Sequence, residues 1–121
     1  MYSKKVIEHA KYPLNQGKLD DADLVQPGAN PLCGDALTIY LKMKDNKVEK
    51  VMYESEGCAI SQAAASVISD ELVGKSADEI KKISTEGMLK LLEIDKLSPS
   101  RIKCAVLALE TVKVAFTKSI E

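Results

Sequence analysis

The stretch Leu37-Thr38-Ile39-Tyr40-Leu41-Lys42-Met43-Lys44 alternates apolar and polar residues without a break. A period of two is typical of a half-buried β-strand, in which every second side chain faces the core. Asp45-Asn46 follows as a turn signal, and residues 48–55 are predicted to form the returning strand of an antiparallel hairpin. The sequence therefore predicts a small antiparallel sheet, which we expect to have about three strands.

Beyond Gly57 the apolar residues recur with a helical period of about 3.6. One face of this predicted helix carries Ile60, Ala64, Val67, Ile68 and Leu72, and Gly74 is expected to end it. Three further helices are predicted at about 76–83, at 88–92, and from Ser98-Pro99 to about 118.

Upstream of the hairpin, residues 3–11 predict a short helix with Ser3 as its N-cap and Pro13 as its stop. Residues 13–32 show no clear periodicity and are predicted to be a long loop. The order of helix, hairpin and helices favours an α+β fold with the helices packed on one face of the sheet. The cysteines considered below lead us to expect a metal site at one end of it. At 121 residues the chain is expected to form a single domain, 1–121.

Composition and charge exclude several classes of protein. Hydrophobic residues make up 45% of the chain, which argues against disorder, and a net charge of −1 offers no general attraction for nucleic acid. No apolar stretch approaches the roughly 20 residues that a membrane-spanning helix needs. The first residues lack the apolar run of a secretion signal, so we expect a cytoplasmic protein with reduced thiols.

Three cysteines, Cys33, Cys58 and Cys104, each fall near the end of a predicted element. An odd number of cysteines in a cytoplasmic chain favours metal binding or thiol chemistry over a disulfide framework. Asp35 would project to the same side as Cys33 in an extended segment, and Cys58 falls at a helix start, where the dipole favours a thiolate. Three thiolates and a carboxylate suit a tetrahedral zinc ion or the irons of a small iron–sulfur cluster.

The residues alone leave this interpretation open, because the cysteines are far apart and match no local zinc finger. Cys104 precedes the apolar Ala105-Val106-Leu107, and a buried cysteine can be simply a small apolar side chain. A carboxylate is also a weaker ligand than a thiolate, which favours a site that releases its contents. The sole histidine, His9, lies on the polar side of the first helix and is expected at the surface.

Three segments together resemble the IscU/SufU/NifU N-terminal family of iron–sulfur cluster assembly scaffolds. They are Asn30-Pro31-Leu32-Cys33-Gly34-Asp35, Glu56-Gly57-Cys58-Ala59-Ile60-Ser61, and Arg101-Ile102-Lys103-Cys104. The resemblance implies a scaffold, not an enzyme, that takes sulfur from a cysteine desulfurase, combines it with iron, and passes a [2Fe–2S] cluster to iron–sulfur acceptor proteins. It implies Cys33, Cys58 and Cys104 as cluster ligands, and Asp35 as the residue that tunes release and ligates zinc in the same site.

Two departures leave the type within the family open. IscU-type members have a histidine where this chain has Lys103, whose side chain is either solvated or holds a sulfur anion by a charge-assisted contact. SufU-type members have an insertion between the second and third cysteines that this chain lacks. The alternative function is therefore a zinc-dependent sulfurtransferase of the SufU type, and a purely structural zinc domain is a third hypothesis. A monomer or weak homodimer is expected.

Overall fold

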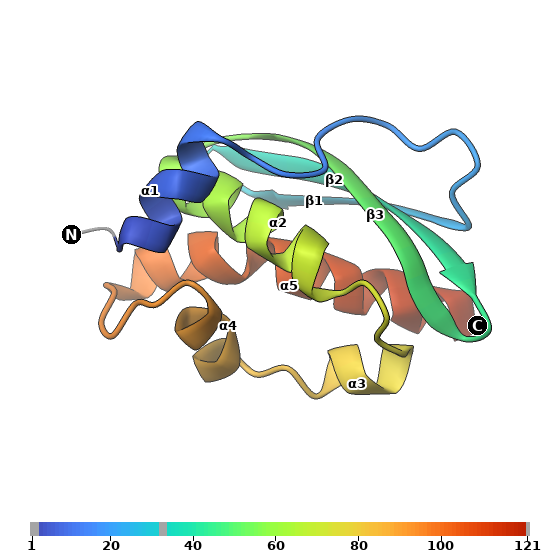
Figure 1. The fold of residues 1–121 in the computed structure, drawn as a ribbon. Helices are drawn as coiled ribbons and strands as arrows, with labels where there is room; N and C mark the ends of the chain where they lie inside the picture. Colours follow the sequence, from blue (N-terminus) through green and yellow to red (C-terminus); the bar gives the residue numbers. More distant parts are fainter. Residues whose placement is uncertain (1–2, 32–33, 121) are drawn as a thin grey trace.

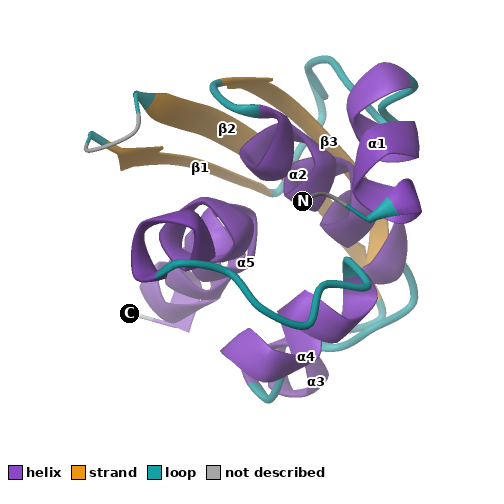
Figure 2. Cartoon of the chain, turned by 90° about the vertical axis from the view of Figure 1, so that its left-hand side faces the viewer, coloured by secondary structure: helices purple, strands orange, loops and turns teal. Residues whose placement is uncertain are grey.

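The computed structural model describes residues 3–31 and 34–120. The elements are, in chain order, α1 (Lys4–Lys11), β1 (Leu24–Asn30), β2 (Asp35–Lys44), β3 (Lys47–Glu56), α2 (Ala59–Glu71), α3 (Ala77–Lys81), α4 (Thr85–Leu91) and α5 (Pro99–Ile120) (Figure 1). The strands form one antiparallel sheet in the order β1-β2-β3. Helices α2 and α5 lie against one face of this sheet, with α1 beside α2 (Figure 2). The predicted α+β fold is confirmed, whereas the single domain over 1–121 stays a prediction.

The hairpin of β2 and β3 follows directly from the alternating sequence. Leu37, Ile39 and Leu41 are buried toward the helices, and Ile39 and Leu41 pair with Tyr53 and Val51 on β3. At the turn, Asp45 and Asn46 both have positive φ angles of 53° and 64°. Such angles belong to the tight turns that match the twist of a hairpin, and asparagine and aspartate tolerate them best among residues with a side chain.

The predicted loop over 13–32 is wrong in part, because residues 24–30 form the strand β1. The strand contains Pro27-Gly28, which weaken any strand pattern in the sequence. Proline is tolerated here because β1 is an edge strand with a single neighbour, β2. Glycine at position 28 is explained by packing, because a Cβ there would lie 2.0 Å from Oγ1 of Thr111 on α5.

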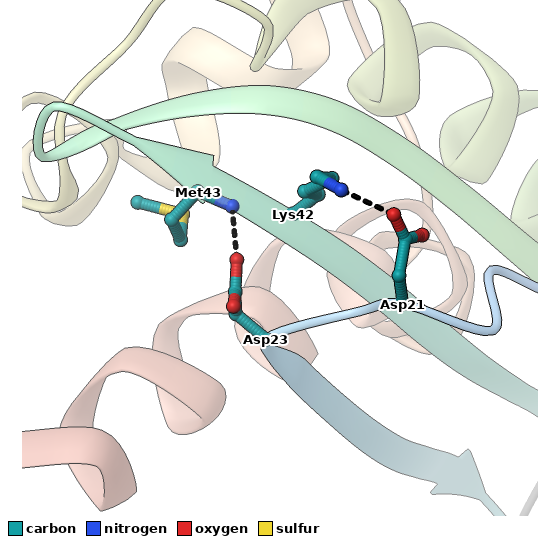
Figure 3. A network of polar contacts seen from close by, with 4 residues as sticks. All are labelled: Asp21, Asp23, Lys42 and Met43. Carbon is teal, nitrogen blue, oxygen red and sulfur yellow. Dashed lines mark hydrogen bonds and ion pairs between the residues drawn. The ribbon is translucent and has the colours of Figure 1, made fainter.

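Two aspartates hold the start of β1 against β2 (Figure 3). Asp21 forms an ion pair with Lys42. The carboxylate of Asp23 accepts a hydrogen bond of 2.7 Å from the backbone N–H of Met43, next to an irregularity in the pairing of β2 with β3. These contacts fix the register of β1, so that its far end, Asn30, lies opposite Asp35.

Small side chains allow α2 and α5 to pack closely under the sheet. Residues that are nearly inaccessible to solvent include Ala63, Ala64, Ala65, Cys104, Ala105 and Ala108, together with the predicted apolar face of α2. The predicted capping box at Ser76 and Glu79 starts α3. Helix α4 begins at Thr85, ahead of the predicted start at Met88, because Ser84 caps it. Among the described helices, none is both long enough and apolar enough to cross a bilayer.

Candidate metal centre

Three segments that are distant in sequence meet at one end of the sheet. Asp35 is the first residue of β2, Cys58 is the N-cap of α2, and Cys104 lies in the second turn of α5. A carboxylate oxygen of Asp35 and the two sulfur atoms lie within 4.8 Å of one another. Cys33, the fourth predicted ligand, lies outside the described residues. The structure thus brings together three of the four residues that the sequence predicted, and their role as ligands stays a prediction.

Cys58 is placed by the way in which the chain enters α2. Its backbone is extended, with φ −76° and ψ 166°, and its sulfur accepts a hydrogen bond of 3.5 Å from the N–H of Ser61. The sulfur therefore satisfies one of the open backbone donors of the first helical turn. The preceding Gly57 has a φ of 140°, which side chains rarely allow, and this turns the chain toward Asp35.

The two oxygens of Asp35 are bound unequally. Oδ1 accepts hydrogen bonds from the backbone N–H of Cys58 at 2.9 Å and from the hydroxyl of Ser61 at 3.1 Å. Oδ2 is buried and accepts no hydrogen bond of normal geometry from any residue that the structure describes. A buried carboxylate oxygen without a partner is costly, so the site favours a cation or proton at this atom.

The surroundings of Asp35 favour its charged form. Burial by itself raises the pKa of this carboxyl, but hydrogen bonding from the Cys104 thiol, the Cys58 N–H and the Ser61 hydroxyl outweighs it and holds the pKa below its ordinary value. A charged carboxylate that is only 2% exposed is a ready ligand for a metal ion.

Cys104 is fully buried, as a small apolar residue would be, yet its sulfur has polar neighbours. The single thiol proton can go either to the backbone oxygen of Ser100, 3.6 Å away, or to the Asp35 carboxylate, and the side-chain amide of Asn30 donates to the sulfur at 3.9 Å. An amide donor favours electron density on the sulfur, and such contacts tune metal-bound thiolates. Burial therefore does not separate the two interpretations of Cys104, but its polar contacts favour a ligand.

The donor set fits zinc or iron. Two sulfurs that share a tetrahedral zinc ion at about 2.3 Å lie about 3.8 Å apart, so the observed arrangement needs an adjustment of no more than about 1 Å. Cys58 is partly exposed, whereas the Cys104 thiol and the Asp35 carboxylate are buried. This group of two sulfurs and one carboxylate could hold a metal ion.

Sequence reasoning missed two residues that contact the predicted ligands, Ser61 and Asn30. Ser61 could have been found, because it stands three residues after the N-cap, where a side chain faces back toward the start of the helix. Asn30 could not, because it belongs to the unpredicted strand β1. Lys103 is exposed beside Cys104, and its role stays open.

His9 differs from the surface residue that was expected. It is partly buried, and its Nδ1 lies 2.7 Å from Oγ of Ser66, a fully buried residue of α2. Burial, and next the charge of Lys5, lower its pKa below 6.5. His9 is not one of the described residues that form the candidate metal group, which are Asp35, Cys58 and Cys104.

Known proteins resemble this chain over nearly its whole length. Residues 1–119 match the family model described as NifU-like N terminal domain. The chain is 38% identical to the iron–sulfur cluster assembly scaffold protein IscU of Thermotoga maritima, over 98% of this chain and 94% of that protein. It is 31% identical to the zinc-dependent sulfurtransferase SufU of Bacillus subtilis, over 98% and 90%. The crystal structure of a nitrogen-fixing NifU-like protein (N-terminal) from Brucella abortus superposes with a TM-score of 0.80, at 26% identity and over 96% and 92% of the two chains.

Proposed function

This chain belongs to the family of NifU-like N-terminal domains, and we propose that it is a scaffold on which [2Fe–2S] clusters are assembled and from which they are passed on. Iron and sulfide are its cargo. The cluster would be held by Cys58 and Cys104 together with Cys33, and Asp35 would keep one ligand position exchangeable. Zinc would occupy the same site when iron is absent.

One observation carries this proposal above the others. Asp35, Cys58 and Cys104 come from three separate elements, and their ligand atoms nevertheless lie within 4.8 Å of one another. Packing alone gives no reason to place a charged carboxylate beside two sulfurs, because a buried charge needs compensation. A cationic cargo supplies that compensation and gives a partner to Oδ2 of Asp35, which accepts no hydrogen bond of normal geometry from the described residues.

The proposal implies two classes of protein partner: a cysteine desulfurase that supplies sulfur, and apoproteins that accept the cluster. Cys58 is the partly exposed member of the described group, so we expect such partners to reach it first. We further infer a cytoplasmic protein that acts as a monomer or weak homodimer and binds neither nucleic acid nor membrane. A net charge of −1 agrees with the absence of a nucleic-acid role.

Anaerobic reconstitution tests the scaffold directly. The metal-free chain is incubated with ferrous iron, cysteine, a cysteine desulfurase and a thiol reductant, and its visible spectrum is recorded. Sulfur-to-iron charge-transfer bands should develop, and transfer to an apo-ferredoxin should follow. The double variant C58S/C104S is the control and should stay colourless. Wild-type protein that stays colourless after zinc removal would contradict the proposal.

A zinc-dependent sulfurtransferase is the second candidate, and two observations favour it. The Bacillus subtilis relative carries that name, and Lys103 stands where IscU-type members have a histidine ligand. In this case zinc is the working metal, and the chain accepts persulfide sulfur from the desulfurase. Removal of zinc with a chelator separates the two candidates. If the chain is a zinc-dependent sulfurtransferase, the zinc-free protein should no longer stimulate the desulfurase. If it is a scaffold, the zinc-free protein should still assemble a cluster.

A further inference from the structure

The hydroxyl of Ser61 lies between two of the candidate ligands, Asp35 of β2 and Cys58 at the start of α2. Its Oγ is 3.1 Å from Oδ1 of Asp35, 3.0 Å from the backbone oxygen of Cys58 and 3.7 Å from the sulfur of Cys58. Ser61 is only 7% exposed, so water competes little for these contacts. A hydroxyl has one proton, and the charged carboxylate is a stronger acceptor than a backbone carbonyl.

The contacts of Ser61 give the Asp35 carboxylate a defined orientation. Oδ1 holds both donors, Ser61 and the N–H of Cys58, whereas Oδ2 has no donor of normal geometry in the described part of the chain. A carboxylate can rotate about its Cβ–Cγ bond and exchange its two oxygens. Two donors on the same oxygen oppose that rotation more strongly than one, and they leave the other oxygen available to an ion.

We propose that Ser61 is a positioning residue for the metal centre, whose hydroxyl fixes Oδ1 of Asp35 and thereby commits Oδ2 to the bound ion. This inference rests on the proposed function, since it requires that Asp35 ligate metal. It assigns to Ser61 the control of how tightly the exchangeable position holds its ion. Groups that orient a ligand in this way typically contribute about 10- to 100-fold in metal affinity.

A merely structural role for Ser61 makes a different prediction. Its contact with the carbonyl of Cys58 is an ordinary local bond of the first helical turn, and losing it would lower stability without affecting metal. Ser69, on the same helix, offers a matched control. It is fully buried, and its hydroxyl donates to the backbone oxygen of Ser66 at 2.7 Å and accepts a hydrogen bond of 3.0 Å from the side-chain amide of Asn15, away from the metal centre.

Zinc affinity, measured by competition with a chromophoric chelator, tests the proposal, and urea unfolding of each metal-free variant reports the structural effect. S61A should bind zinc about 10-fold more weakly than wild type, whereas S69A should bind it with unchanged affinity. In a D35A background, the additional S61A change should have no further effect. The proposal would be overturned if S61A lowered zinc affinity about 10-fold in the D35A background as well, or if it did not lower zinc affinity in the wild type.

The pair S61T and S61V separates the hydroxyl from the space that the side chain fills. The two side chains have nearly the same shape, so both meet the same packing, and both are measured if S61A does not fold. S61T should bind zinc more tightly than S61V by about 10-fold, and equal affinities would count against the proposal. If zinc binding requires Asp35 but tolerates S61A, only this inference fails; a wild-type chain that binds neither zinc nor iron overturns the scaffold itself.

Discussion

Gly57 lies directly against Asp35. A Cβ built on Gly57 would be 2.2 Å from Oδ1 of Asp35 and 2.9 Å from its Cα, both far inside van der Waals contact. One of these atoms is backbone and cannot move aside cheaply. The chain can enter α2 this close to Asp35 only because Gly57 has no side chain. This contact sets where Cys58 lies relative to the carboxylate.

The variant G57A should lose both stability and metal affinity. A side chain at a φ of 140° is strained, and strain of this kind costs about 1–3 kcal/mol. The new methyl group must also push the Asp35 carboxylate away. Urea unfolding of the metal-free protein and zinc competition measure the two losses separately.

G74A is the matched control for this variant. Gly74 also has a positive φ, 88°, but a Cβ there would meet no atom within 4 Å, and it lies beyond the other end of α2. G74A should cost stability with zinc affinity unchanged. Equal affinities of G57A and wild type for zinc would show that the Gly57–Asp35 contact does not shape the site.

The two described thiols should differ in their reaction with alkylating reagents. Cys58 is partly exposed and Cys104 is fully buried, so in metal-free protein iodoacetamide should modify Cys58 first. Mass spectrometry of tryptic peptides at increasing times gives both rates. Zinc should slow both reactions if both sulfurs are ligands. Faster modification of Cys104 would contradict the observed burial.

Stability should fall at acidic pH in part through His9. Because burial and Lys5 hold its pKa in the folded chain below the ordinary 6.5, the unfolded chain binds more protons as the pH falls. The contribution of neutral His9 is therefore complete above about pH 6.5 and is lost as the pH falls through the lower, folded-state pKa. Nδ1 of His9 lies 2.7 Å from Oγ of Ser66, and the neutral ring can accept a hydrogen bond from this hydroxyl at Nδ1.

The variant H9Q tests this, because a glutamine side chain can accept the same hydrogen bond and does not titrate. Unfolding free energies of wild type and H9Q are compared by urea denaturation between pH 7.5 and 5. The wild type should lose stability relative to H9Q on acidification. A difference that is independent of pH would refute the coupling.

Packing of β1 on α5 can be tested at Gly28. A Cβ there would meet Oγ1 and Cγ2 of Thr111 at 2.0 and 3.0 Å, so G28A should lower the free energy of unfolding by about 1–3 kcal/mol. Adding T111A removes both atoms and should restore part of the loss in urea unfolding. If T111A makes the loss larger by its full single-variant cost, the two residues are not in contact.

The fold could be predicted where apolar residues are periodic. Leu37, Ile39 and Leu41 alternate because one face of β2 meets the helices, and the face of α2 repeats with the helical period. Strand β1 could not be predicted, because it is held by its neighbour and by Asp21 and Asp23 rather than by alternation. Local sequence carries no sign of such contacts with distant residues.

The candidate site, too, could be predicted only where local sequence signals exist. Asp35 and Cys58 could be placed at element ends by local signals, but nothing local indicates that Cys104 lies beside them. The residue types and their places at element ends suggested a shared site but left it open, and resemblance to a family implied it. The structure brings the two described sulfurs together with the carboxylate. The sequence could place Ser61 near the start of α2, but not its contact with Asp35, because Asp35 lies on another element.

The most direct test of the central claim, that distant sulfurs and a carboxylate share one ion, is X-ray absorption at the zinc edge of the zinc-loaded protein. The spectrum should show sulfur neighbours at about 2.3 Å together with oxygen at about 2.0–2.2 Å. At saturating zinc, C58S and C104S should each lose one sulfur from this shell. A shell of oxygen and nitrogen alone, or a sulfur count that neither variant changes, would contradict the account.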